Sequence, residues 1–153
     1  VAAFVRRNGF ALNIEIKPTA GLEAETGRVV AREAERLWRG AGIAPLLSSF
    51  EPPSLAAARD AVRGLRRALL LDRLAPGWFE LAQELECAAV VTAYPLMDAA
   101  VIARLHGAGL RALCYTVNDP AEAQRLIGLG IDGIITDAVD RFSPAASAGT
   151  VLD

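Results

Sequence analysis

The sequence predicts an α/β fold in which parallel strands alternate with helices, and three observations lead to this class. Short apolar runs and longer amphipathic segments alternate along the 153 residues, which is the pattern of repeated βα units. The longest uncharged apolar run, CAAVVTAYPLM, is shorter than the roughly 20 residues of a membrane span. Such runs are typical of buried parallel strands. No GxGxxG or GxxxxGKS motif follows a predicted strand, which disfavours a nucleotide-binding open sheet.

The remaining architecture for repeated βα units is a closed barrel. A (β/α)8 TIM-type barrel typically needs about 250 residues. The chain shows about six of the eight βα units within its 153 residues. We therefore expect a barrel that lacks its first two strands in this chain.

The expected elements follow one another in a regular order. The apolar side chains of Val1, Phe4 and Val5 are typical of the last turns of a helix. Short apolar runs predict strands at residues 11–17, 45–49, 68–72, 88–92, 112–117 and 133–136. The amphipathic segments between them predict helices at residues 23–39, 54–64, 78–85, 98–106 and 120–129. Asp119, Pro120 and Glu122 give the last helix an N-cap, a first-turn proline and a capping-box acid.

Composition excludes several classes of function. The net charge is −2 and the basic residues are scattered along helices, so we expect no nucleic-acid partner. Cys87 and Cys114 lie in apolar runs without CxxC spacing, which favours two buried small side chains over a disulfide or a metal site. No signal-peptide pattern is present, and we expect a cytoplasmic protein without a membrane span.

The strand predicted at residues 11–17 carries an unusual pair of charges. Side chains alternate between the two faces of a strand, so Ile14 and Ile16 point one way and Glu15 and Lys17 the other. An ion buried without a partner is costly. The ionic face therefore holds either an internal ion pair or a site where a carboxylate meets a hard cation and a lysine meets a phosphate.

Polar residues also end the other predicted strands. In parallel βα folds, functional residues gather at the carboxyl ends of the strands. Asp119 and Asp137 are best explained as helix caps or turn residues. The polar residues at these ends are Ser48, Ser49, Asp72, Thr92, Tyr94, Tyr115, Thr116, Asn118 and Thr136.

Four segments carry a resemblance to a known family. LNIEIKP, LLSSF, CYTVND and GIDGIITD occur in this order between about residue 3 and residue 140. Together they resemble the C-terminal portion of the glycerophosphodiester phosphodiesterase family, in its bacterial cytoplasmic form. The resemblance implies a barrel enzyme that uses a divalent cation, Mg²⁺ or Ca²⁺. It also implies a glycerophosphodiester substrate, hydrolysed to sn-glycerol 3-phosphate and an alcohol.

The resemblance also implies roles for individual residues. Glu15 matches a carboxylate metal ligand, and Lys17 matches a lysine near the phosphate. Substrate-binding positions match Ser49, Phe50, Tyr115 and Asn118. The histidines that serve the family as general acid and base have no match, because the only histidine, His106, falls at the end of a predicted helix. We therefore expect the 153-residue segment alone to be inactive.

Two further expectations concern the chain as a whole. Residues 1–142 should form the barrel portion, and the small and polar residues 143–153 should form a flexible tail. The alternative to an enzyme is a non-catalytic barrel module that binds phosphate or glycerol phosphate. The sequence leaves the choice of metal, the head-group preference and the oligomeric state open.

Overall fold

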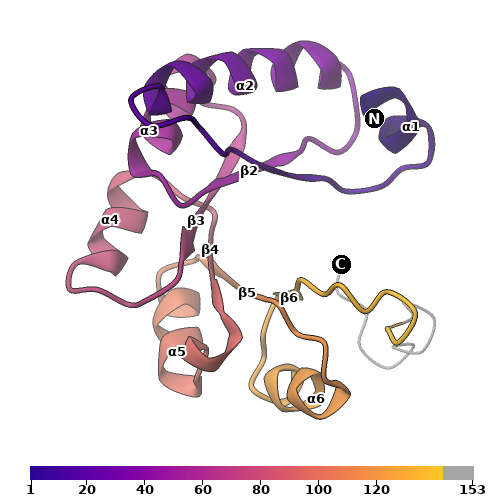
Figure 1. Cartoon of the computed structure of the whole chain (residues 1–153), viewed down its shortest axis with the longest axis vertical. Coiled ribbons are helices and arrows are strands. Elements are labelled where there is room, and N and C mark those ends of the chain that lie inside the picture. Colours follow the sequence, from indigo (N-terminus) through magenta and orange to yellow (C-terminus); the bar gives the residue numbers. More distant parts are fainter. Residues whose placement is uncertain (143–153) are drawn as a thin grey trace. The chain divides into compact units, whose positions relative to one another are not determined.

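The computed structural model describes residues 1–142, which form two compact units (Figure 1). Unit 1 contains residues 1–70 and 76–88, and unit 2 contains residues 71–75 and 89–142. The tail expected at residues 143–153 lies outside the described residues. No helix within residues 1–142 is both long and apolar enough to cross a membrane.

Unit 1 is built from parallel strands with helices between them. In chain order, the elements are α1 (Ala2–Arg7), β1 (Asn13–Glu15), α2 (Glu23–Trp38), β2 (Leu46–Ser49), α3 (Pro52–Ala61), β3 (Arg66–Leu71) and α4 (Trp78–Glu84). β2 pairs in parallel with β1 on one side and with β3 on the other, as the sequence predicts. β1 is shorter than predicted, and Lys17 lies just after it. Hydrogen bonds of the ladder still continue beyond the strand, from the Ile16 amide to the Ser48 carbonyl at 2.7 Å.

The core of unit 1 lies between β1, β2 and the helices α2 and α3. Ile16 is 2% exposed and packs with Leu47 of β2. Ile14 packs against the same cluster, so Ile14 and Ile16 lie on one face, as predicted, and this face is covered by the helices. The other members are Ala31, Ala34, Ala58, Val62 and Leu65, with Val30 and Ala61 at the margin. Glu15 and Lys17 therefore occupy the opposite face.

Helices α2 and α3 approach each other unusually closely. The point of contact is Gly27, where a Cβ atom would collide with the carbonyl oxygen of Ser54. The Ser54 hydroxyl, in turn, donates a hydrogen bond to the Glu23 carbonyl at 3.0 Å. A glycine inside a helix normally costs stability, and here it permits the crossing.

The buried Arg67 forms hydrogen bonds to the loop between α4 and the strand that follows it. The Arg67 guanidinium donates to the carbonyl oxygens of Leu65 at 2.6 Å, Glu86 at 3.0 Å and Leu85 at 3.2 Å. Glu86 has a left-handed backbone with φ of 51°, which non-glycine residues rarely adopt. Burial lowers the pKa of Arg67 from its ordinary value. The sequence gives no sign of this arrangement, because an arginine in a strand predicts an exposed side chain.

Unit 2 repeats the same alternation. Its elements are β4 (Ala89–Ala93), a short 3₁₀ helix η1 (Tyr94–Leu96), α5 (Ala99–Gly107), β5 (Arg111–Tyr115), α6 (Pro120–Gly128) and β6 (Gly133–Ile134). β5 pairs in parallel with β4 and with β6. Asp119 caps α6 by accepting a hydrogen bond from the Ala121 amide at 2.9 Å, and Pro120 is the first helical residue, as predicted.

The two cysteines are buried, as the sequence predicts. Cys87 is 8% exposed, Cys114 is fully buried, and both are free thiols. Burial raises the pKa of each thiol from 9.0 to about 11. The thiols therefore stay protonated near neutral pH and act as small apolar side chains.

Candidate functional site

The charged pair of β1 lies at the carboxyl end of the strand, where it was predicted. Lys17 Nζ is 3.5 Å from Glu15 Oε1. The Lys17 side chain is 78% exposed and the Glu15 side chain 34%. An exposed ion pair of this kind contributes little to stability, typically about 0–1 kcal/mol. Both charges are therefore accessible to a ligand.

Ser48 and Ser49 end β2, the strand that pairs with β1. Their side chains face opposite sides of the sheet. Ser49 shares the helix-facing side with Leu47 and is fully buried. Its hydroxyl donates to the Ile16 carbonyl at 2.8 Å and accepts from the Glu51 amide at 3.1 Å. These bonds join the carboxyl ends of β1 and β2. Contact between Ser49 and a substrate stays a prediction.

Ser48 lies on the other side, in register with Glu15 on the neighbouring strand. It is fully buried, and its hydroxyl has no hydrogen-bond partner among the residues that the structure describes. The family resemblance implies a site role for Ser49 alone, and the strand register is what places Ser48 beside Glu15. Phe50 follows the pair and is 41% exposed at the end of β2.

The remaining predicted residues belong to unit 2. Tyr115 ends β5, is half-buried and donates its hydroxyl to the Leu71 carbonyl at 2.9 Å. Asn118 Oδ1 accepts hydrogen bonds from the Thr136 hydroxyl and from the Asp137 amide, both at 2.9 Å. Asn118 therefore joins the loop after β5 to the loop after β6. The predicted residues thus form two groups, one at the strand ends of each unit.

A divalent cation would find one carboxylate in the first group. Mg²⁺ and Ca²⁺ prefer oxygen ligands that include carboxylates, and the exposed Glu15 carboxylate fits this chemistry. Among residues 1–142, no group of three or more histidine, cysteine, aspartate and glutamate side chains could hold a metal ion. Glu15 therefore fits as one member of a larger set of ligands.

His106 lies at the C-terminal end of α5, as predicted. Its Nε2 atom is 2.7 Å from Asp132 Oδ2, the same oxygen that accepts a hydrogen bond from the Ala112 amide at 2.7 Å. Arg111 Nη1 is 3.7 Å from the other oxygen of Asp132. These groups gather at the amino ends of β5 and β6, whereas Tyr115 lies at the carboxyl end of β5. The histidine thus links a helix to the sheet and is remote from the strand end where Tyr115 and Asn118 lie.

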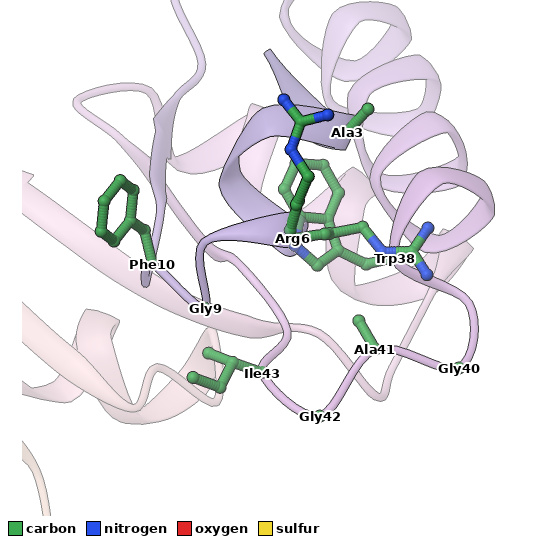
Figure 2. A pocket seen from close by; sticks show the side chains of 10 residues that line it. Ala3, Arg6, Gly9, Phe10, Trp38, Gly40, Ala41, Gly42 and Ile43 are labelled. Carbon is green, nitrogen blue, oxygen red and sulfur yellow. The ribbon is translucent and has the colours of Figure 1, made fainter.

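A cavity in unit 1 lies away from the charged pair. It has a volume of about 590 Å³ and lies between α1, the end of α2 and the loop that precedes β2 (Figure 2). Phe10, Trp38 and Ile43 line it, together with Arg6, whose guanidinium donates to the Leu37 carbonyl at 2.7 Å. None of the predicted site residues lines this cavity.

Comparison with known proteins identifies the family. The family model of the glycerophosphoryl diester phosphodiesterases matches residues 1–141. The chain belongs to this family. No curated protein matches the chain. The resemblance inferred from four sequence segments is thereby confirmed.

Solved structures of the phosphodiesterase family show the same fold. A phosphodiesterase from Oleispira antarctica, in complex with the product sn-glycerol 3-phosphate, has a TM-score of 0.82 and 24% sequence identity over 96% of this chain and 59% of that chain. A candidate glycerophosphoryl diester phosphodiesterase from Silicibacter pomeroyi has a TM-score of 0.79 and 21% identity over 92% of this chain and 51% of that chain. The phosphodiesterase from Thermotoga maritima has a TM-score of 0.64 and 22% identity over 87% of this chain and 56% of that chain.

These likenesses confirm the predicted fold class. The chain has the fold of part of a (β/α)8 barrel, with parallel strands and alternating helices. It spans between about half and three fifths of the length of these three solved structures.

Proposed function

We propose that the protein hydrolyses glycerophosphodiesters to sn-glycerol 3-phosphate and an alcohol, with the help of Mg²⁺ or Ca²⁺. The observation that carries the proposal is the Glu15 and Lys17 pair, 3.5 Å apart and exposed at the carboxyl end of β1, in a chain that belongs to the phosphodiesterase family. The sn-glycerol 3-phosphate in the related Oleispira antarctica structure supports a product of the same chemical class.

Each residue of the site has a role in this proposal. Glu15 would hold the cation, which supplies Lewis-acid stabilisation of a phosphoryl group when bound. The Lys17 ammonium places a compact positive charge beside the phosphate oxygens, where charge develops as phosphorus is attacked. Substrate contacts at Ser49, Phe50, Tyr115 and Asn118 stay predictions from the family resemblance.

The general acid and base are not among these residues. His106 is the only histidine in the chain. It is hydrogen-bonded to Asp132 at the amino ends of β5 and β6. The family resemblance assigns proton transfer to histidines with no counterpart here. We therefore expect the 153-residue segment alone to be inactive. The activity assays below use the protein at its native length.

Replacing Glu15 with alanine in the native-length protein tests the proposal. Purified protein is assayed on glycerophosphocholine and on glycerophosphoethanolamine, with and without a chelator. We expect cation-dependent release of sn-glycerol 3-phosphate by the wild type and its loss in Glu15→Ala. Glu35→Ala, a change of an exposed carboxylate on α2, serves as the control and should retain activity. Turnover that survives both the chelator and Glu15→Ala would exclude the cation role.

The same experiment distinguishes the alternative function. A protein that binds sn-glycerol 3-phosphate but turns over neither substrate would be a phosphate-binding barrel module. Calorimetric titration with sn-glycerol 3-phosphate measures that binding directly. The cytoplasmic location stays a prediction from the sequence, and a cell-fractionation experiment tests it.

A further inference from the structure

Within residues 1–142, the hydroxyl of Ser48 does not form the hydrogen bond that a buried structural serine normally forms. Ser48 is fully buried, yet its hydroxyl has no hydrogen-bond partner within the described residues. A buried polar group without a partner destabilises a fold, because it loses its bonds to water and gains none in return. Such a group calls for an explanation.

The position of Ser48 in the sheet supplies one. Ser48 and Glu15 are register partners on adjacent parallel strands, so their side chains leave the sheet on the same face. Neighbouring strands are about 4.8 Å apart, a distance that a glutamate and a serine side chain can span with a hydrogen bond. Lys17 approaches Oε1 of the carboxylate, which leaves the second oxygen for another donor.

The neighbouring serines differ in this respect. Ser49 and Ser54 are as deeply buried as Ser48, but the hydroxyl of each is bonded to a backbone carbonyl, that of Ile16 for Ser49 and that of Glu23 for Ser54. Their hydroxyls therefore form hydrogen bonds within the folded chain. Of these three serines, only Ser48 keeps a hydroxyl available on the face that carries Glu15.

We propose that Ser48 is a positioning residue: when a cation is bound, its hydroxyl donates a hydrogen bond to the Glu15 carboxylate and orients the carboxylate toward the cation. This inference rests on the proposed function, since it takes Glu15 to be a cation ligand. Groups that orient a metal ligand typically change metal affinity about 10- to 100-fold when they are removed. Ser48 touches neither substrate nor cation in this role.

Calorimetric titration of Mg²⁺, and separately of Ca²⁺, into the native-length apoprotein tests the proposal. We expect Ser48→Ala to weaken cation binding about tenfold. The thermal unfolding midpoint of the apoprotein should stay unchanged or rise, because the change removes an unpaired buried hydroxyl. Ser54→Ala is the matched control. It should lower the midpoint, because it breaks a bond made in the fold, and it should leave cation affinity unchanged.

The outcomes separate this inference from the proposed function. Weakened binding in Glu15→Ala together with wild-type affinity in Ser48→Ala would overturn the role of Ser48 and leave the function standing. A Ser48→Ala protein that loses both affinity and stability would show a structural role, which also overturns the inference. If Glu15→Ala binds the cation as the wild type does, the cation role of Glu15 fails and that of Ser48 fails with it. Ser48→Thr, which keeps a hydroxyl, should restore binding.

Discussion

Lys17 carries its charge just beyond β1, and its side chain is largely exposed. Because an exposed ion pair adds at most about 1 kcal/mol, Lys17→Ala should fold normally. Loss of one electrostatic donor at a reacting centre typically costs roughly 2.7 to 4 kcal/mol of transition-state stabilisation. We therefore expect kcat on glycerophosphocholine to fall by about 10²- to 10³-fold. Arg32→Ala, which removes an exposed charge from α2, is the control, and equal activity in both variants would contradict the role.

The cysteines make stability depend on pH in the alkaline range. Burial raises the pKa of Cys87 and Cys114 from 9.0 to about 11 in the folded chain. Above pH 9 the unfolded chain loses these protons while the folded chain keeps them, so the free energy of unfolding falls as pH rises. The stabilising contribution is complete below pH 9 and is lost as pH rises toward about 11.

Urea unfolding of the wild type and of Cys114→Ala, at about pH 8 and about pH 10.5, checks this expectation. Lysine and tyrosine residues titrate in the same range, so the comparison with the variant isolates the thiol. The decrease in unfolding free energy between the two pH values should be smaller in Cys114→Ala. Equal decreases would show that the Cys114 thiol does not contribute.

The strand face that carries Glu15 and Lys17 could be predicted from the sequence, and the faces of Ser48 and Ser49 could not. Glu15 and Lys17 alternate with two isoleucines, and alternation identifies the face of a strand that is buried on one side only. Leu47, Ser48 and Ser49 of β2 are all buried, so the sequence there shows no alternation. Which serine shares a face with Glu15 depends on the register between two strands, and a single strand does not encode that register.

At the scale of the helices, the crossing of α2 and α3 at Gly27 governs stability. Gly27→Ala adds a methyl group that would collide with the Ser54 carbonyl. We expect a loss of roughly 1 to 3 kcal/mol from overpacking, although alanine favours a helix by up to about 1 kcal/mol. Gly128→Ala at the end of α6 is the control, because nothing lies within 4 Å of the added atom. Urea unfolding of both variants should show destabilisation only for Gly27→Ala.

Helix and strand positions were largely predictable, and their ends less so. Asp119 and Pro120 fix the start of α6 by local chemistry, and the sequence placed it correctly. The predicted strands at residues 11–17 and 133–136 shorten to β1 (Asn13–Glu15) and β6 (Gly133–Ile134). Each of these strands pairs with one neighbour within its unit, and a strand's length depends on partners that its own sequence does not specify.

At the scale of the whole chain, the family could be predicted from the order and spacing of short sequence segments. The four segments that resemble the family, in their order and spacing, predicted the family that the match over residues 1–141 confirms. The division into two units was not predictable, because it depends on contacts between residues far apart in the sequence. Residues 71–75 belong with unit 2, although they directly follow most of β3 in unit 1.

This division gives each unit its own spectroscopic reporter. Both tryptophans, Trp38 and Trp78, belong to unit 1, and the single histidine, His106, belongs to unit 2. Tryptophan fluorescence therefore follows one unit, and the imidazole proton resonances of His106 follow the other. The chain passes between the units three times, after residues 70, 75 and 88, so we expect the two signals to change at the same urea concentration. Separate midpoints would reveal two folding units that can open one at a time.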